Sequence, residues 1–433
     1  MNSIFPNYCC IILLLLFCKM GSAQKLVSKP FIGHTDSASV NVWCMFQKAQ
    51  AVFIRNSDGQ QKIFLWDKQK CYKKYLPITI HFGQLQKNKA YTLEYSFNGQ
   101  NYYPLISVQT DNIDSLQNIS FLAGSCAFIS TGFNGIIKPF NSLRIFKEMK
   151  KDSSNMLLWL GDNLYYVLQP FNYKSQLKRN IKTRLNKKLN ELLASKQNYA
   201  IWDDHDYGHN NSDGFFKFKK NSLNVFQQFW PNPTNDTFNY FTYKKSDVQF
   251  FMLDDRYNNE HEKSVLGTTQ LAWLKKELAA SDANFKFICI GMQAINPVST
   301  KECFYKTTSE FKSLLDYIQL QKINGVVFLS GDRHHAELLR VQENGMYPLY
   351  DFTTSPLTMY PVKIGKRSKE LKNPYRIVGT YYPSYNYGKI TVSGDFNARK
   401  CLLELKNKQG NVIWRYEINK EDLVIKPQPL IIN

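Results

Sequence analysis

The chain has 433 residues, and its 55 Lys and Arg against 35 Asp and Glu give a formal net charge of +20. Hydrophobic residues make up 43% and charged residues 21%, a balance that supports a folded core and excludes an intrinsically disordered chain. A single long apolar run, at the N-terminus, excludes a membrane protein with several spans. The length favours about two domains. The basic excess leaves nucleic acid, anionic lipid and phosphorylated small molecules open as partners.

The N-terminal segment has the features of an export signal. Ile11–Phe17 is an apolar run that is too short to span a bilayer. The small residues Gly21–Ala23 precede Gln24 as at a signal peptidase site. We therefore expect residues 1–23 to be a signal peptide and the mature chain to be secreted or periplasmic, without a transmembrane segment. No Lys or Arg precedes the apolar run, and a retained membrane anchor is the alternative.

Residues 24–114 are expected to form a small antiparallel β-sandwich of the immunoglobulin or fibronectin kind. Three of its segments have the residue pattern of short β-strands, in which the character of the side chain alternates from one residue to the next: Ser39–Cys44, Ala51–Ile54 and Tyr91–Tyr95. Turn residues at Asn56–Gly59 and Asn98–Gly99 follow such segments, as in short β-strands joined by tight turns. This part has no catalytic cluster, and we interpret it as a support or docking module.

Residues 119–418 show the alternation of strands and helices that is typical of an α/β domain. The expected strands are Ile119–Gly124, Met156–Gly161, Tyr199–Trp202, Val248–Leu253, Phe285–Gly291 and Val326–Gly331. The expected helices are Phe140–Lys150, Gln176–Leu193, Thr268–Leu278 and Ser309–Leu320. Two further strands, Lys400–Leu405 and Val412–Tyr416, precede a C-terminal tail at 419–433.

Polar residues follow nearly every expected buried strand. The clusters are Ser125-Cys126, Asp162–Tyr165, Asp203–Asp206, Asp254–Arg256 and Asp332–His334. Ligands of α/β proteins bind outside the carboxyl ends of the strands, so these dispersed side chains are expected to converge on one site. Carboxylates, imidazole, thiolate and phenolate are metal ligands, and gathered carboxylates would repel each other strongly without cations. Two metals would also suit phosphoryl chemistry.

The ordered motifs resemble those of the alkaline phosphatase D (PhoD-like) family of calcineurin-like metallophosphoesterases. The motifs are Gly124-Ser125-Cys126, Gly161-Asp162-x-x-Tyr165, the stretch Trp202–Asn210, Leu253-Asp254-x-Arg256 and the stretch Gly331–Glu337, with Thr354–Thr358 and Asn386–Gly388 further on. The resemblance covers about residues 119–418. It implies a four-layer α/β/β/α metallophosphatase core, and the preceding β-module is similar to one found before many such cores.

The resemblance also implies a metal centre with a ferric ion and calcium, or another divalent pair such as Zn, Mn or Mg. The implied metal ligands are Cys126, Asp162, Tyr165, Asp204, Asp332 and His334. Asp162 would bridge the metals and Cys126 would bind iron as a thiolate. His205 would be the acid that protonates the leaving group, and Arg256 would contact phosphate. A further set would bind substrate or support the ligands: Asp203, Asp206, Asn210 and Arg333.

Several of these residues have structural alternatives. Cys126 could be a buried core thiol, and Asp203 could cap the turn that follows it. Asp206 and Asn210 could orient His205 or bind calcium. Arg256 could pair with a neighbouring carboxylate instead of phosphate.

We therefore expect an exported metal-dependent hydrolase of phosphoric esters, acting on a phosphate-ester small molecule or a phospholipid-type substrate, as a monomer. Metal-activated water would attack phosphorus while His205 protonates the leaving alkoxide. One alternative is a phosphodiesterase or phospholipase D-type hydrolase on the same site, and another is a catalytically inactive exported binding protein. The basic stretch Lys174–Lys188 reads as a helix with a solvated face and the apolar stripe Leu177, Ile181 and Leu185. No specific nucleic-acid binding is expected.

Overall fold

The structure is a computed structural model that describes residues 24–112, 115–129, 143–166, 170–233, 237–261 and 263–426. The expected signal peptide at residues 1–23 lies outside the described residues. None of the helices in the described ranges has both the length and the apolarity that a membrane crossing requires.

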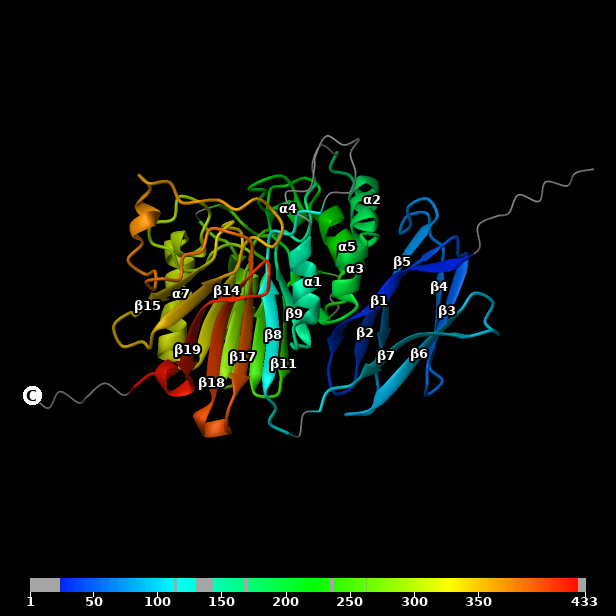
Figure 1. Ribbon diagram of the computed structural model, residues 1–433, viewed down its shortest axis with the longest axis horizontal. Coiled ribbons are helices and arrows are strands. Elements are labelled where there is room, and N and C mark those ends of the chain that lie inside the picture. Colours follow the sequence, from blue (N-terminus) through cyan, green and yellow to red (C-terminus); the bar gives the residue numbers. More distant parts are fainter. Residues whose placement is uncertain are drawn as a thin grey trace, which may run out of the picture.

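Two sheets form the centre of the molecule (Figure 1). The nine-stranded sheet has the order β19-β18-β17-β8-β9-β10-β1-β2-β5, and the six-stranded sheet has the order β11-β12-β13-β14-β16-β15. In the first sheet, the strands that follow residue 115 are β8 (Ile119–Gly124), β9 (Met156–Leu160), β10 (Gln197–Ile201), β17 (Asn386–Ser393), β18 (Lys400–Asn407) and β19 (Val412–Asn419). The second sheet contains β11 (Phe241–Lys245), β12 (Val248–Met252), β13 (Phe285–Cys289), β14 (Val326–Ser330), β15 (Glu337–Val341) and β16 (Leu349–Thr353).

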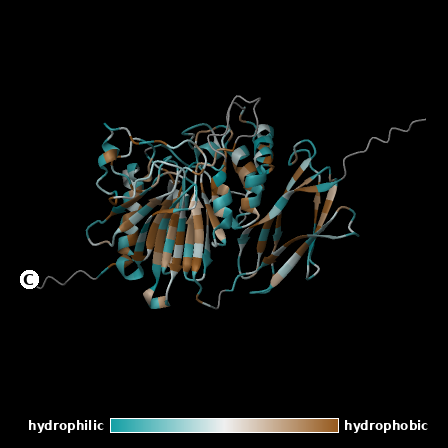
Figure 2. Ribbon diagram, in the orientation of Figure 1, coloured by the Kyte–Doolittle hydropathy of each residue, from teal (hydrophilic) through white to brown (hydrophobic). Residues whose placement is uncertain are grey.

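The inner strands of both sheets are parallel. In the first sheet β8 pairs with β9 and β9 with β10. In the second sheet β12, β13, β14 and β16 pair in that order. Strands β9, β13 and β14 are buried along their whole length, as expected for parallel sheets that are covered on both faces. Figure 2 shows these strands as predominantly hydrophobic. Phe121 of β8 packs edge-on against Phe250 and Phe287 of the other sheet, which joins the two sheets through one apolar core.

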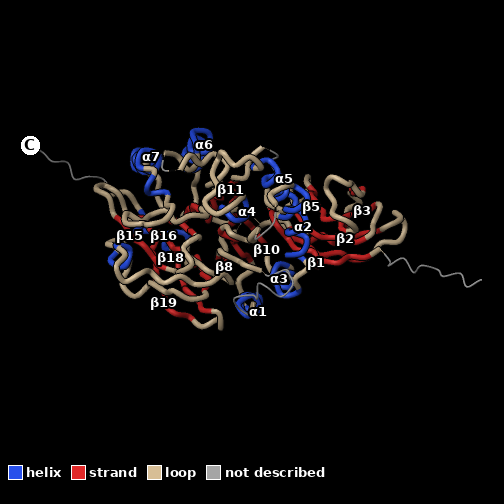
Figure 3. The backbone as a smooth tube through the Cα atoms, turned by 90° about the horizontal axis from the view of Figure 1, so that it is seen from above, coloured by secondary structure: helices blue, strands red, loops and turns tan. Residues whose placement is uncertain are grey.

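Helices cover the outer faces of the two sheets (Figure 3). The nine-stranded sheet is covered by α1 (Arg144–Lys151), α2 (Tyr173–Arg184), α3 (Lys187–Leu193) and α5 (Lys219–Phe229). The six-stranded sheet is covered by α6 (Gly267–Ala280) and α7 (Thr308–Leu320). The predicted α/β fold class with its α/β/β/α layers is therefore confirmed.

The predicted single helix Gln176–Leu193 is wrong, because the structure has two helices there. The first helix ends at Arg184, and Asn186 begins the second, since its side chain accepts hydrogen bonds from the backbone N–H groups of Lys188 and Leu189. Leu185, expected in an apolar stripe, is the C-cap of α2 and is 38% exposed.

Two of the basic residues in this region are buried rather than solvated. Arg179 donates to the carbonyl of Ile129 at 2.8 Å. The Arg184 guanidinium lies 4.2 Å from the ring centroid of Trp230, and burial lowers the pKa of Arg184 to about 9. The predicted solvated face is thus limited to lysines: Lys174, Lys187 and Lys188 are exposed.

The N-terminal strands contribute to both a separate sheet and the central sheet. Strands β3 (Ala51–Asn56), β4 (Gln61–Leu65), β6 (Ala90–Ser96) and β7 (Tyr103–Gln109) form a four-stranded antiparallel sheet. Facing it across an apolar cluster are β1 (Lys25–Thr35), β2 (Val40–Gln47) and β5 (Tyr75–Phe82). Strand β1 also pairs in parallel with β10, at Ile32 and Gln197. The central sheet therefore runs on without interruption into the predicted β-sandwich.

The chain remains ordered past the predicted limit of the catalytic domain at residue 418. Lys420–Leu423 forms a 3₁₀ helix, and Leu423 is fully buried in the central core.

Candidate metal centre

The carboxyl ends of the parallel strands bring the expected metal ligands together. Cys126 follows β8, Asp162 follows β9, and Asp204 with His205 begins the short helix α4 (Asp204–Tyr207) after β10. Asp332 and His334 follow β14 of the other sheet. The two sheets meet at this end, where the Ser125 hydroxyl donates to the carbonyl of Thr354 at 2.9 Å. Residues that are far apart in sequence therefore share one site, as strand-end placement predicts.

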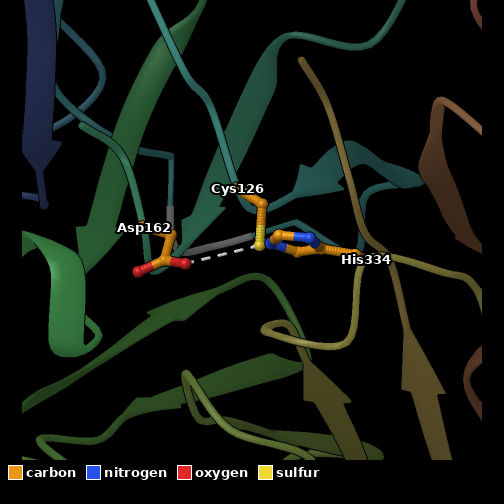
Figure 4. Close-up of side chains that lie close together, drawn as sticks. All are labelled: Cys126, Asp162 and His334. Carbon is orange, nitrogen blue, oxygen red and sulfur yellow. Dashed lines mark hydrogen bonds between the residues drawn. The ribbon is translucent and has the colours of Figure 1, made fainter. Parts of the chain in front are cut away.

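One group of potential metal ligands consists of Cys126, Asp162 and His334, whose ligand atoms all lie within 4.8 Å of one another. Figure 4 shows these three side chains pointing toward one another from three separate segments. Cys126 Sγ donates to Asp162 Oδ2 at 3.6 Å. Tyr165 Oη donates to the same oxygen at 2.9 Å, which places the phenol in this group as well.

Two further groups share Asp162. The first combines Asp162 with Asp204 and His205, and the second combines Asp162 with Asp203 and Asp332, again with ligand atoms within 4.8 Å of one another. Asp162 is thus common to all three groups, and a carboxylate shared in this way would be able to contact two cations. His205, Asp332 and His334 are partly exposed, so the site opens to solvent on their side.

The electrostatics of the site fit bound cations. Burial, followed by the charges of Asp204 and Cys126, raises the pKa of Asp162 well above its usual range. Burial, followed by the charge of Asp332, raises the pKa of the Cys126 thiol to about 12. Burial therefore favours the protonated forms of both groups when no cation is present, whereas a metal ion would favour their ionised forms. Asp203 Oδ2 and Asp204 Oδ1 are buried without a hydrogen-bond partner, and such oxygens are available for metal coordination.

The backbone at the site is held in an unusual conformation. Cys126, Asp162, Asp332 and His334 have φ values of 56°, 54°, 61° and 55°. Residues other than glycine rarely adopt this left-handed region, and such strain concentrates at functional sites. All four are candidate metal ligands, so the strain coincides with the centre identified from side-chain geometry.

Arg256 lies behind the metal ligands and is fully buried. Its Nε donates to Asp203 Oδ1 at 2.6 Å, and its Nη1 donates to Glu302 Oε2 at 2.9 Å. Asp255 lies at 3.7 Å from the same guanidinium. In this structure Arg256 is thus engaged by three carboxylates, which corresponds to the pairing alternative raised from the sequence.

Asp203 and Asp206 cap helix α4. The Asp203 side chain accepts from the backbone N–H of Asp204 at 2.9 Å, and Asp206 accepts from that of Asp203 at 3.2 Å. Asp206 also accepts from the backbone N–H of Asn163 at 3.0 Å. This ties the segment after β10 to the segment after β9, and burial raises the pKa of Asp206 to about 7.

Two of the expected residues do not join the cluster. Asn210 is exposed, and its amide donates to Asn211 Oδ1 at 2.8 Å. Arg333 is buried and forms an ion pair with Glu370, while its Nη1 donates to Ser299 at 2.9 Å. Arg333 therefore links the strand end that carries Asp332 to the loop that carries Ser299 and to the 3₁₀ helix Lys369–Lys372.

Ser355 is a site residue to which the sequence motif assigned no role. Its hydroxyl donates to Cys126 Sγ at 3.2 Å and accepts from the backbone N–H of His334 at 2.9 Å. It thereby holds two metal-ligand candidates from different sheets. Ser355 follows β16, so it is a further polar residue after a strand end, and recognition of that strand would have revealed it.

Gly331 allows the strand ends to approach closely. A Cβ at this position would lie 2.5 Å from the carbonyl oxygen of Leu160 and 2.7 Å from Cβ of Ser125. We expect Gly331→Ala to lower the free energy of unfolding by about 1–3 kcal/mol, because well-packed backbone must shift. Thermal unfolding measures this loss. Gly365→Ala, where nothing lies within 4 Å, is the matched control, and equal midpoints for the two variants would contradict the close packing.

The sequence profile of the PhoD-like phosphatase family matches residues 121–399. The chain belongs to the PhoD-like phosphatase family. A solved structure described as the structure of PhoD has a TM-score of 0.71 at 15% identity, covering 90% of this chain and 91% of that chain; at this identity the likeness shows the fold. Vps29 structures from Entamoeba histolytica and Chaetomium thermophilum have TM-scores of 0.27 at 9% and 7% identity. These matches cover 70% and 73% of this chain and 99% and 100% of the Vps29 chains. A TM-score this low supports no inference about this chain. No curated protein matches the chain.

Membership of the PhoD-like family makes the chain a metallophosphoesterase, a hydrolase that acts on phosphate esters. The matched residues contain all the strand ends described above. The candidate metal groups therefore lie within the part of the chain that the family profile matches.

Proposed function

We propose that this PhoD-like chain is an exported hydrolase of phosphoric monoesters or diesters that works with two metals at Asp162. The observation that carries the proposal is that Asp162 belongs to all three groups of potential metal ligands at the strand ends. A carboxylate in that position can hold two cations close together, the arrangement that stabilises both the attacking and the leaving oxygen at phosphorus.

We propose a ferric ion and calcium as the metals, with a Zn, Mn or Mg pair as the alternative. Cys126, Tyr165 and His334 offer thiol, phenol and imidazole groups, which suit iron. Asp204 and Asp332 offer the carboxylate oxygens that calcium prefers. When bound, the metals would polarise the phosphate and lower the pKa of the attacking water.

His205 is the proposed acid that protonates the leaving alkoxide. Its backbone N–H donates to Asp162 Oδ1 at 3.2 Å, and its ring lies 4.3 Å from the ring of Tyr165. The imidazole is thus positioned beside the candidate metal ligands and remains partly exposed, where an alkoxide can reach it. Arg256 acts in this proposal by fixing Asp203, to which it donates at 2.6 Å.

A panel of matched substrates tests the proposed activity. The purified chain, loaded with Fe³⁺ and Ca²⁺, is assayed with p-nitrophenyl phosphate and with bis(p-nitrophenyl) phosphate. Hydrolysis of either ester supports the proposal. A strong preference for the diester favours the alternative of a phosphodiesterase or phospholipase D-type hydrolase. Absence of hydrolysis with both metals bound would contradict the proposal and favour an inactive binding protein.

The export part of the proposal rests on the sequence of residues 1–23. The intact mass of the mature protein tests it, because cleavage after Ala23 leaves a chain that begins at Gln24. A mature protein that retains the first residues would contradict cleavage and favour the membrane-anchor alternative.

A further inference from the structure

A cavity of about 750 Å³ lies next to the candidate metal centre. We call it the lysine pocket, and the lining residues used below are Asn211, Phe215, Glu260, Lys263, Lys301, Glu302 and Lys306. One wall contacts the centre directly, and another contacts it through Arg256. The backbone N–H of Asn211 donates to Asp204 Oδ2 at 2.6 Å. Glu302 accepts from Arg256 at 2.9 Å, and Arg256 in turn donates to Asp203 at 2.6 Å. A substrate held at the metals could therefore extend into this cavity.

Lysines outnumber carboxylates in the lysine pocket. Lys263, Lys301 and Lys306 line it together with Glu260 and Glu302, and Glu302 forms an ion pair with the buried Arg256. Lys263 and Lys301 are exposed, and no ion pair involves either of them in the part of the chain that the structure describes. Their ammonium groups are therefore free to bind an anion.

Phe215 adds an apolar surface at the same place. Its side chain lines the pocket and the residue is 77% exposed, so the ring is accessible to a ligand. An aliphatic or aromatic spacer would cover this ring. The pocket thus combines a wall against the metal centre, an apolar patch and the exposed side chains of Lys263 and Lys301.

We propose that the lysine pocket binds a second anionic group of the substrate, so that the preferred substrate is a phosphoester whose alcohol itself carries a phosphate or carboxylate. This proposal rests on the proposed function, because it places the scissile phosphate at the metal centre. The spacer between the two anions crosses the face of Phe215, and the second anion is held by Lys263 and Lys301.

Binding of matched alkylphosphonates tests the proposal without depending on turnover. Each compound carries one phosphonate for the metal centre and a chain end that is a methyl group, a carboxylate or a second phosphonate, with spacers of graded length. Calorimetry on the metal-loaded full chain gives the dissociation constants. At the best spacer we expect an anionic end to tighten binding about tenfold over the methyl end, as charge-assisted hydrogen bonds allow. This gain in affinity should decrease as the salt concentration rises.

A variant in which the charge of both Lys263 and Lys301 is reversed tests their part in binding. The double variant Lys263→Glu with Lys301→Glu should lose the tenfold gain and keep the affinity for the methyl-ended compound. Lys312→Glu, on a lysine whose side chain is 72% exposed and lies on α7, should retain the gain. Equal affinities for charged and neutral ends at every spacer, or a gain that survives the double reversal, would overturn the proposal. Failure of all compounds to bind would instead contradict the metal centre of the proposed function.

Discussion

Asp162→Asn is expected to remove metal binding and hydrolysis together. Asparagine keeps the size of the side chain but loses the charge that all three ligand groups share. We expect kcat/KM to fall by about 1,000-fold or more, which corresponds to about 4 kcal/mol of transition-state stabilisation. Elemental analysis of the purified variant should show loss of both metals. Asp316→Asn, at a carboxylate whose side chain is 58% exposed on α7, is the matched control and should keep metals and activity.

The same variant has an opposite effect on the metal-free protein. Burial and like charges raise the pKa of Asp162 in the folded state, so the folded metal-free protein binds a proton that the unfolded chain has already released. Its stability therefore decreases as the pH rises above about 4, the usual range of an Asp pKa. With chelator present at neutral pH, Asp162→Asn should unfold at the same or a higher temperature than the unmodified chain. A variant that is less stable under these conditions, or that retains both metals, would contradict the bridging position.

His205→Ala is expected to leave the metals bound and to slow alkyl esters more than activated aryl esters. An alkoxide needs a proton to leave, whereas p-nitrophenolate does not. Loss of a general acid typically costs about 100- to 10,000-fold, and we expect a loss in that range for a methyl or glyceryl ester. The loss for p-nitrophenyl esters should be at least about tenfold smaller, since protonation contributes little there.

The kcat/KM values of both ester types, measured side by side with metal content, check this expectation. His209→Ala is the control, because His209 is exposed and its ring packs against Phe171 at 4.1 Å. An equal loss on alkyl and aryl esters would remove the acid role from His205. Loss of metal in His205→Ala would show instead that the imidazole is mainly a ligand, as its place in one of the ligand groups allows.

The sequence predicted the parallel strands and the residues that follow them because buried strands have a strong local signal. The predominantly apolar runs at β9, β13 and β14 are followed by Gly-Asp or Gly-Met steps that are visible without a structure. The position of Ser355 was missed because β16 was not recognised as a strand. The break between α2 and α3 was also missed, although Asn186 is a good N-cap residue.

Long-range pairings could not be predicted from local patterns. Glu302 lies 46 residues after Arg256, and Glu370 lies 37 residues after Arg333, so nothing in either motif indicates which carboxylate neutralises the arginine. Periodicity likewise treats Arg184 as a surface residue, whereas the aromatic residues around it, Trp230 among them, come from other segments. Such partners depend on the tertiary fold, which places separate segments side by side.

The structure shows where part of the basic excess of the chain lies. The net charge of +20 includes two buried arginines of α2 that stabilise the fold, and the lysines beside the metal centre line a cavity rather than a groove for nucleic acid. Several of the 35 acidic residues lie at the strand ends, where cations would neutralise them. Positive charge around such a site would attract phosphate esters from dilute solution.

The most direct test of the central claim is to measure metal content and phosphoester hydrolysis on the same purified sample before and after chelation. We predict about two metal ions per chain and hydrolysis of a phosphoester. Both should be lost on chelation, and both should return when Fe³⁺ and Ca²⁺ are added. A protein that hydrolyses phosphoesters after complete removal of metal, or that binds two metals and hydrolyses neither monoesters nor diesters, would contradict the account.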